Sequence, residues 1–527
     1  MPIRMTDDPV DPNQPDDNSG GGGNRPNFPG GGGGGLMSLL PLLLGLFKGK
    51  GIIFLLVLGA VAYFLLGRSG GCNVEQIISQ FSQSGYNFNP AEFNKASVYE
   101  GLEDDNAKNP IPEAVSLLRF APDRSNQGQQ GSCVAWSAAY AAQTILISAA
   151  SGSDPNQIAF SPSYLYNQIR LEGCQGSYLQ KAMEAMQKNG GVALSQYPYN
   201  DQDCERTPNS SEVQVGRQNV IHGFTRITNG DNINEISVRG IKEHLAKDAP
   251  VAIGMMVGQS FMQDMMGKEL WEPSGMDASQ MGMGGHAMCV IGYDDRKFGG
   301  AFQIMNSWGP EWGKNGIAWV KYRDFSTYVR EAYGIDPLPK RSAVANIPLE
   351  CTIGLVNNAN KEYIQLRSAG GNSFQTVSPI AVGTRFKMEI KNETECYIYI
   401  FGQETDGTSF VLFPYLKKGE TVSKHSPYCG ITGYRLFPKS QSLEADSSGN
   451  RDYIAILVSK DELDYNQLNQ AISSSPETNY AAKVNEALRS LQIRSVRYNN
   501  TSDGTIYFKA AANDNKAVAM IVAFDKQ

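Results

Sequence analysis

The sequence predicts an α+β protein with one membrane-spanning helix ahead of its mixed region and a smaller β-rich domain at its end. Three observations predict this class. An uncharged apolar run lies near the N-terminus, an alanine-rich helical stretch and several apolar strands share the middle of the chain, and short alternating runs follow Pro339. A hydrophobic content of 41% in 527 residues is enough for two or three domains with cores of their own.

The N-terminal region divides into a polar tail and an apolar segment. Residues 1–35 are rich in Asp, Pro, Asn and Gly, which predicts a disordered tail because little apolar surface is available for burial. Residues 36–67 form the predicted membrane segment, and its uncharged run 51–67 spans about 25 Å as a helix. A buried core helix and a cleaved signal peptide fit less well, because low-complexity sequence surrounds the run and a long polar segment precedes it.

Flanking positive charges predict how the membrane segment is oriented. Only Arg68 follows the run closely, whereas four basic residues precede it: Arg4, Arg25, Lys48 and Lys50. The positive-inside tendency predicts a single pass, with the N-terminus in the cytoplasm and the chain after residue 68 outside. Residues 68–111 then form a tether, in which 87–102 is a candidate docking segment. A cytoplasm-facing orientation remains the alternative.

Charge and cysteine content exclude two classes of protein. The formal net charge is −7 and no run of Lys or Arg occurs, so nucleic-acid binding is not expected. Eight cysteines are too few for a disulfide scaffold, although they allow one or two bridges in an oxidising compartment.

Cys133 begins the alanine-rich stretch in "SNQGQQGSCVAWSAAYAAQ". Alone, a cysteine at a helix start is more often a core residue than a nucleophile, and a nucleophile needs a base, usually histidine. Of the four histidines, His244 lies in a polar helical stretch and is predicted to be solvated, His222 lies in an isolated strand pattern, and His425 lies in a later domain. His286 remains, in "MGGHAMCVIGYDD", where two glycines precede an apolar strand.

Three blocks now stand in order: "QGQQGSCVAWS", "GGHAMCVIGYDD" and "IMNSWGPEWGKNG". They resemble the active-site blocks of the papain family of cysteine peptidases, in the family's order of Cys, His and Asn. The stretches "GCQGSYLQKAMEAMQKNGGVALSQYPY" and "PVAIGMMV" are also similar to family segments, and the bacterial branch is the most similar. The resemblance implies a two-lobed papain-like domain over residues 112–340, with Cys133 in a helical lobe and His286 and Asn306 in a β-rich lobe.

The resemblance also implies a role for each site residue. Cys133 is the nucleophile, favoured as a thiolate by the helix start and by a protonated His286. His286 protonates the leaving amine and later activates water, while Asn306 orients the imidazole. The Gln127 side chain and the Cys133 N–H form the oxyanion hole. Trp308 covers the contact between His286 and Asn306. No cofactor or metal is implied, and the H-x-x-C spacing of His286 is not read as a zinc site.

Binding residues and a disulfide follow from the same comparison. Gly176, Ser177 and Gly285 are expected to contact an extended polypeptide, although Ser177 stands where the family usually has glycine. Gln130 occupies the place of a disulfide cysteine of the family, which leaves its usual partner, Cys174, to bridge to Cys204. The methionine-rich stretch 258–284 is either a packed surface loop or a lid on the cleft.

Residues 345–527 are predicted to form a β-rich accessory module. Alternating runs such as "FKMEIKN", "CYIYIFGQ" and "YIAILVS" are typical of strands, and "DG" marks a turn at 406–407. One or two helices are expected over 461–491 and a final hairpin over 505–527. The module resembles accessory domains of unknown function on bacterial peptidases and kinases, so structural support or a protein partner is its expected role.

Together these features predict a membrane-anchored cysteine endopeptidase that hydrolyses polypeptides outside the cytoplasm, in the cell envelope of a bacterium. Three alternatives remain open: transfer of the acyl group to an amine, as in a transpeptidase, a non-catalytic membrane-anchored scaffold, and a cytoplasm-facing enzyme. Residues 68–111 are too short for the helical inhibitory pro-region of papain relatives, so inhibition of that kind is not predicted.

Overall fold

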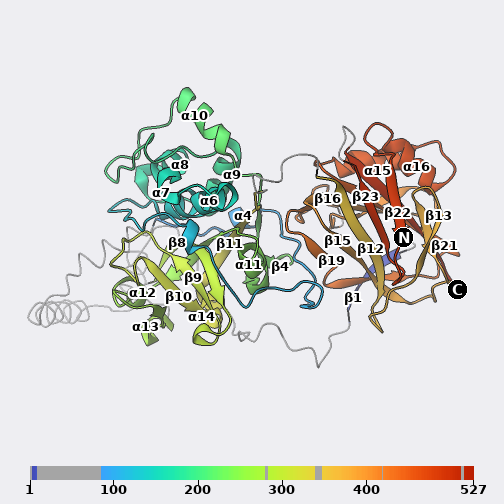
Figure 1. Ribbon diagram of the computed structural model, residues 1–527, viewed down its shortest axis with the longest axis horizontal. Helices are drawn as coiled ribbons and strands as arrows, with labels where there is room; N and C mark the ends of the chain where they lie inside the picture. The colour runs from blue at the N-terminus through green and yellow to red at the C-terminus, as the bar shows by residue number, and fades with distance from the viewer. Residues whose placement is uncertain (1–2, 9–84, 279–282, 339–346, 418, 512–515) are drawn as a thin grey trace, which may run out of the picture.

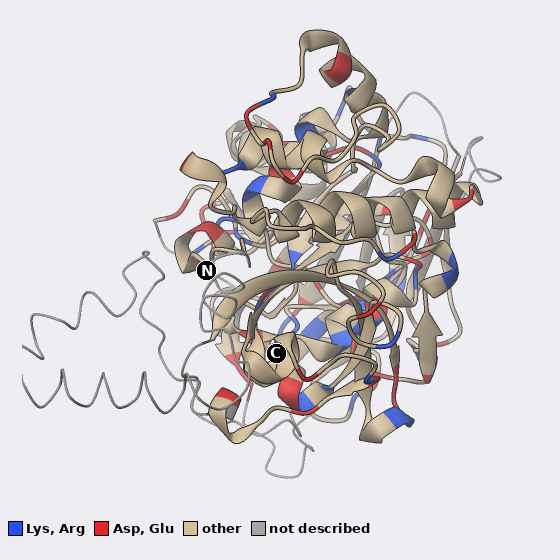
Figure 2. Ribbon diagram, turned by 90° about the vertical axis from the view of Figure 1, so that its left-hand side faces the viewer, with Lys and Arg blue, Asp and Glu red and all other residues tan. Residues whose placement is uncertain are grey.

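The computed structural model describes residues 3–8, 85–278, 283–338, 347–417, 419–511 and 516–527. These residues form a first domain, residues 112–338, and a second domain, residues 347–527, which lie side by side in Figure 1. Residues 85–111, hereafter the strap, run between them. The predicted membrane run 51–67 lies outside the described residues. In Figure 2 the positions of Lys and Arg are interspersed with those of Asp and Glu along the ribbon rather than separated by sign.

The helical lobe of the first domain is built around one buried helix, Cys133–Ser151, which comprises α5 (Cys133–Ala135), a π-helical stretch and α6 (Thr144–Ser151). It ends at Gly152, whose φ of 72° suits glycine at a helix C-terminus. Among the described residues it alone is long and apolar enough to cross a membrane, but 83% of its apolar window is buried inside the protein. It is therefore the core helix, packed against α8 (Pro162–Ile169) and α9 (Leu179–Asn189).

The other lobe is an eight-stranded sheet in the order β3-β11-β6-β8-β9-β10-β7, with β2 paired to β8. Its central strand β8 is almost entirely buried, because the core helix covers one face and α11 (Val238–Leu245) also packs against it. The strands are β2 (Ala114–Ser116), β3 (Phe224–Arg226), β6 (Val251–Val257), β7 (Leu270–Trp271), β8 (Gly284–Asp294), β9 (Ala301–Met305), β10 (Ile317–Lys321) and β11 (Val329–Ile335).

The second domain is a sandwich of two seven-stranded sheets. One has the order β1-β20-β15-β12-β23-β22 with β19 on β15, and the other β13-β14-β24-β21-β16-β17 with β18 on β16. Two helices, α15 (Tyr465–Ser474) and α16 (Tyr480–Ala487), pack a second apolar cluster onto the latter sheet. The strands between the N-terminal β1 and the last two are β12 (Leu349–Asn357), β13 (Leu366–Gly370), β14 (Ser373–Thr376), β15 (Arg385–Asn392), β16 (Cys396–Gln403), β17 (Ser409–Phe413), β18 (Tyr428–Cys429), β19 (Gly433–Phe437), β20 (Gln441–Ala445), β21 (Arg451–Ser459) and β22 (Val496–Asn500).

The predicted final hairpin is wrong. Strand β23 (Ile506–Ala510) joins the first sheet of the sandwich, whereas β24 (Ala517–Asp525) joins the second, between β21 and β14. Eight consecutive residues of β24 are buried because the sandwich core covers one face and the helical layer covers the other. Such a strand needs neighbours on both edges, which a terminal hairpin does not supply.

Residues 3–7 depart from the predicted disorder of 1–35. They form strand β1 (Ile3–Asp7), which pairs antiparallel with β20 through backbone hydrogen bonds that do not depend on side-chain type. Lys387 Nζ lies 2.5 Å from Asp8 Oδ2 and extends this contact. Both ends of the described chain therefore lie in the second domain (Figure 1).

Candidate active site

Cys133 is the first residue of the core helix and is fully buried. Burial raises the pKa of the Cys133 thiol to about 12, and the backbone N–H groups of Ala287 and Val134 offset part of this rise. The expected thiolate is therefore not the stable form in this structure. The cause is burial of the thiol, since a desolvated anion is unfavourable.

His286 and Asn306 lie at adjoining positions of two paired strands. His286 is the third residue of β8, and Asn306 directly follows β9, the antiparallel neighbour of β8. The His286 Nε2 donates to Asn306 Oδ1 at 2.7 Å, because an amide oxygen can only accept. Trp308 stacks on the imidazole, with ring centroids 4.2 Å apart and planes 26° from parallel. This pair is held in one orientation and shielded from water.

Gln127 lies on the loop before the core helix, and its buried amide is fixed at both ends. Its Nε2 donates to the Gln130 carbonyl at 2.9 Å, and its Oε1 accepts from Ser307 Oγ at 2.7 Å. The Gln127 backbone N–H also donates to the Ser307 carbonyl at 2.8 Å. Because the buried Gln127 amide lies on the loop that leads into the Cys133 helix, it is a candidate donor to an oxyanion beside Cys133.

Two residues that the sequence did not single out hold this loop. Ser307 donates its backbone N–H to Asn306 Oδ1 at 2.8 Å, so it joins Gln127 to the His286–Asn306 pair. Tyr199 donates its hydroxyl to the Gln127 carbonyl at 2.7 Å and lies 2.6 Å from Ser132 Oγ. In the sequence, Ser307 was marked only by its position between Asn306 and Trp308, and Tyr199 only by the "QYPY" motif.

Cys174 and Cys204 form a disulfide, with Cα atoms 6.1 Å apart. Gln130, at the place of the missing cysteine, instead donates to the Asn200 carbonyl at 3.2 Å. One cluster of metal-type ligands occurs among the described residues, namely Cys174, Cys204 and Glu205. Its sulfur atoms are bonded to each other, so they are not available as thiolate ligands.

The strap lies in the groove between the lobes. The Ser177 N–H donates to the Gly85 carbonyl at 2.9 Å, and the Asn87 N–H donates to the Ser177 carbonyl at 3.1 Å. Gly85 also forms a backbone bridge with His286, and a Cβ on Gly85 would come within 2.1 Å of the Gly131 carbonyl. Residues 85–87 therefore occupy the groove beside His286, Gly131 and Ser177. The Ser177 hydroxyl donates away from the groove to the Ile169 carbonyl, so serine leaves the binding backbone accessible.

Tyr86 fills a pocket beside the groove and is 5% exposed. Two glycines make room for its ring: a Cβ on Gly254 or Gly285 would lie 2.1 or 2.6 Å from ring atoms. Tyr333 Oη donates to Glu331 Oε2 at 3.1 Å at the buried end of this pocket. Burial raises the pKa of Glu331 to about 8, with partial offset by the hydroxyls of Tyr86 and Tyr333. The pocket thus accepts an aromatic ring that ends in a polar group.

The methionine-rich stretch supports Trp308. Phe261 on α12 (Gln259–Met262) lies 6.0 Å from Trp308 and 4.9 Å from Trp312 between ring centroids, and Trp312 Nε1 donates to the Phe261 carbonyl at 2.7 Å. Trp271 packs edge-on to Phe261 at 5.2 Å. The described part of 258–284 is therefore a packed support for the indole over His286.

His244 corrects a prediction. It is buried on α11, where its ring packs at 4.5 Å from Tyr99 of the strap and its Nδ1 lies 2.8 Å from the Gly240 carbonyl. Burial lowers the pKa of His244 to about 4, so it is neutral at pH 7. The prediction of a solvated residue was wrong because the strap covers this face of the helix.

Comparison with known proteins agrees with this geometry. Residues 121–334 match the family model described as papain family cysteine protease. Cathepsin K of Mus musculus is 28% identical over 212 residues, which are 40% of this chain and 59% of that protein. Cathepsin L2 of Homo sapiens is 29% identical over 253 residues, covering 45% and 67%.

A crystal structure of xylellain, a cysteine protease from Xylella fastidiosa, aligns with a TM-score of 0.40 and 21% identity over 49% of this chain and 97% of that one. The chain thus spans less than two thirds of the cathepsin K that it matches. Residues 121–334 are a papain family cysteine protease domain, set within a longer chain.

Proposed function

We propose that this chain is a cysteine peptidase that hydrolyses polypeptides through an acyl-enzyme on Cys133. The observation that carries the proposal is the His286–Asn306 hydrogen bond of 2.7 Å under Trp308, on the strand that faces the start of the Cys133 helix. The thiol transfers its proton to His286, and the thiolate attacks the scissile carbonyl. Gln127 and the Cys133 N–H stabilise the oxyanion.

Collapse of that intermediate breaks the C–N bond, and His286 returns the proton to the leaving amine. Water then attacks the thioester with His286 as the base, which releases the acid and restores the thiol. Asn306 accepts from the imidazole throughout, so it stabilises the charged form of the ring. Ser307 keeps the Gln127 amide aligned with this pair.

The substrate is proposed to be an extended polypeptide lying where the strap lies now. The backbone of Ser177 offers one donor and one acceptor, which a peptide backbone complements as an added strand does. The pocket of Tyr86 favours a substrate side chain that combines an aromatic body with a polar tip. Substrate entry requires residues 85–87 to leave the groove.

Membrane attachment through 51–67 is part of the proposal, and β1 bears on its topology. If β1 stays paired with β20 in the membrane-bound protein, then residues 3–7 and both domains lie on the same side of the bilayer. Residue-specific labelling of Asp7→Cys and Lys509→Cys in intact cells tests this. If a membrane-impermeant reagent labels Lys509→Cys but does not label Asp7→Cys, the result would support the single pass predicted from charge.

The test of the catalytic proposal is labelling by a thiol-directed epoxide, followed by peptide mapping. It uses the Tyr86→Ala chain, in which the groove is easier to enter, and Cys133→Ala and Cys289→Ala as matched variants. Label is expected on Cys133 and is retained in Cys289→Ala, since Cys289 is a buried cysteine on β8, the strand that carries His286. Absence of label on Cys133 at neutral pH would refute the proposal.

A further inference from the structure

The middle of the strap forms a strand shared by the two domains. On one side, Tyr99 N–H donates to the Arg226 carbonyl at 3.0 Å and Arg226 N–H donates to the Ser97 carbonyl at 2.8 Å. On the other side, Val98 N–H donates to the Lys424 carbonyl at 2.5 Å, and the Val98 carbonyl accepts from the Ser426 N–H at 3.2 Å. Val98 itself is fully buried. The second domain thus closes over this strand.

Buried charges reinforce the contact at Glu100. Its carboxylate pairs with His425 Nδ1, and its carbonyl accepts from Arg435 Nε at 2.9 Å. Arg435 is almost fully buried and also donates to Asn392 Oδ1 at 2.6 Å. These charge-assisted hydrogen bonds add to the backbone contact between the strap and the second domain.

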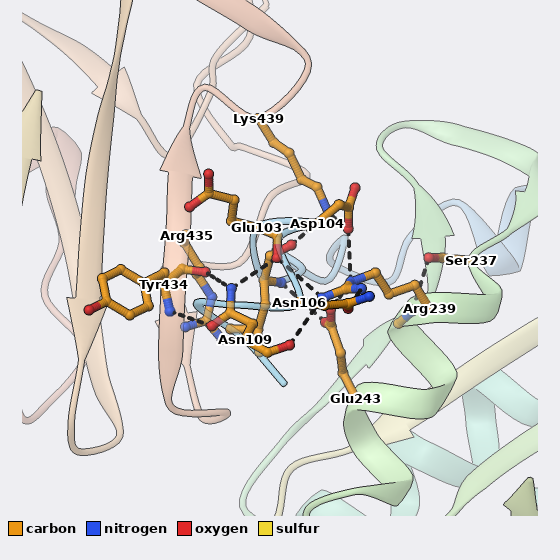
Figure 3. A network of polar contacts seen from close by, with 12 residues as sticks. Glu103, Asp104, Asn106, Asn109, Ser237, Arg239, Glu243, Tyr434, Arg435 and Lys439 are labelled. Atoms are coloured by element: carbon orange, nitrogen blue, oxygen red, sulfur yellow. Dashed lines mark hydrogen bonds and ion pairs between the residues drawn. The ribbon is translucent and has the colours of Figure 1, made fainter. Parts of the chain in front are cut away.

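The end of the strap is fixed by the polar network of Figure 3. Asn109 mimics a backbone partner of Tyr434, donating to its carbonyl at 3.0 Å and accepting from its N–H at 2.9 Å. Asp104 lies between two cations, 2.9 Å from Arg239 of the first domain and 3.2 Å from Lys439 of the second. Lys108 pairs with the buried Glu389 of β15. The strap therefore contacts both domains and joins them.

The start of the strap is connected rigidly to this anchor. Helix α4 (Pro90–Phe93) is capped by Asn89, and Phe93 packs edge-on against Tyr333 at 5.4 Å, next to the Tyr86 pocket. Asn94 then accepts from Arg226 at 2.8 Å and from Lys424 at 3.2 Å, one residue from each domain. Little slack remains between the groove and the anchor.

We propose that the second domain is an intramolecular clamp that binds the strap and thereby keeps residues 85–87 in the substrate groove. Its occupant is a segment of this chain, and its function is to lower the activity of the first domain until the clamp opens. Residues 85–87 stay attached to the clamped part of the strap, so their rebinding to the groove is intramolecular. The clamp therefore acts by raising their local concentration at the groove. The inference rests on the proposed function for its activity readout only.

Two charge reversals in the full chain test the clamp: Lys108→Glu, against Glu389 and Glu103, and Lys439→Glu, against Asp104. Lys509→Glu is the matched control, because it makes the same charge change on β23, where Lys509 pairs with Glu350 at 3.0 Å. The readout is the rate at which a small epoxide labels Cys133 at neutral pH. An increase of about fivefold or more is expected for each clamp variant and none for the control.

Hydrogen exchange at the Asn87 and Ser177 amides reads the same clamp without the thiol, and faster exchange is expected in both clamp variants. The clamp would be overturned if the exchange rates and labelling rates of both clamp variants, and of the double variant, equalled those of the native chain. Fast labelling of Tyr86→Ala beside native rates in the clamp variants would overturn the clamp while leaving the peptidase proposal standing. No labelling of Cys133 in any variant would refute the peptidase proposal, and exchange would then decide the clamp.

Discussion

Replacing Tyr86 by alanine should open the groove. A tyrosine ring buries about 150–250 Å², and at about 25 cal/mol per Å² the loss of most of that contact weakens the hold of residues 85–87 by about 3 kcal/mol. Since about 1.4 kcal/mol is a factor of ten, the open fraction rises about a hundredfold. Contact between the ring and the walls at Gly254 and Gly285 ceases, whereas the backbone bonds to Ser177 and the bridge to His286 remain.

The assay is the second-order rate of epoxide labelling at Cys133, with Tyr507→Ala as control. Tyr507 lies on β23 in the second domain, where its hydroxyl bonds Glu350, so its loss should leave the labelling rate unchanged. Equal labelling rates in the native chain and in Tyr86→Ala would refute the reasoning, provided that both chains show a cooperative thermal unfolding transition. It would also fail if the native chain were labelled at the rate of a freely exposed thiol.

Three further predictions concern the site itself. Gln127→Ala should lower kcat about 100- to 1,000-fold with a smaller change in KM, because one oxyanion donor is lost, and an unchanged kcat would remove Gln127 from the oxyanion hole. In the native chain, the rate of Cys133 alkylation by iodoacetamide should rise only toward pH about 12, the raised pKa of the buried thiol. In Tyr86→Ala this rise should move to lower pH, because water and the imidazolium can then reach the sulfur. Identical pH profiles for the two chains would contradict this. Replacing Cys174 and Cys204 by serine should lower the free energy of unfolding by about 3 to 4 kcal/mol, the value for a loop of this length, as measured by urea unfolding; the sequence separation is 30.

Much of the site was predictable because its chemistry lies in separate motifs of restricted residue types. Cys133, His286 and Asn306 each stand in a block with glycine or tryptophan neighbours, and four histidines allowed elimination. Ser307 and Tyr199 were not predictable, since a hydroxyl residue next to a strand has no pattern of its own. Their roles come from hydrogen bonds to Gln127 that depend on how the two lobes meet.

The fold was predictable where residue types alternate along a strand and not where tertiary contacts decide. The alternation in "FKMEIKN" and "CYIYIFGQ" predicted β15 and β16. The apolar β24 was wrongly assigned to a hairpin, because elements that are distant in the sequence cover its two faces. The strap is the clearest case. Gly85 and Tyr86 have no periodicity, and their place in the groove depends on contacts with His286, Gly131 and Ser177.

The measurement that tests the central claim most directly is cleavage of an extended peptide by Tyr86→Ala, compared with the double variant Tyr86→Ala/Cys133→Ala, with products identified by mass spectrometry. The site described here predicts peptide-bond hydrolysis by the first chain, at a rate above that of the native chain, and none by the second. Equal cleavage by both chains, or no cleavage by Tyr86→Ala while Cys133 accepts the epoxide, would contradict it.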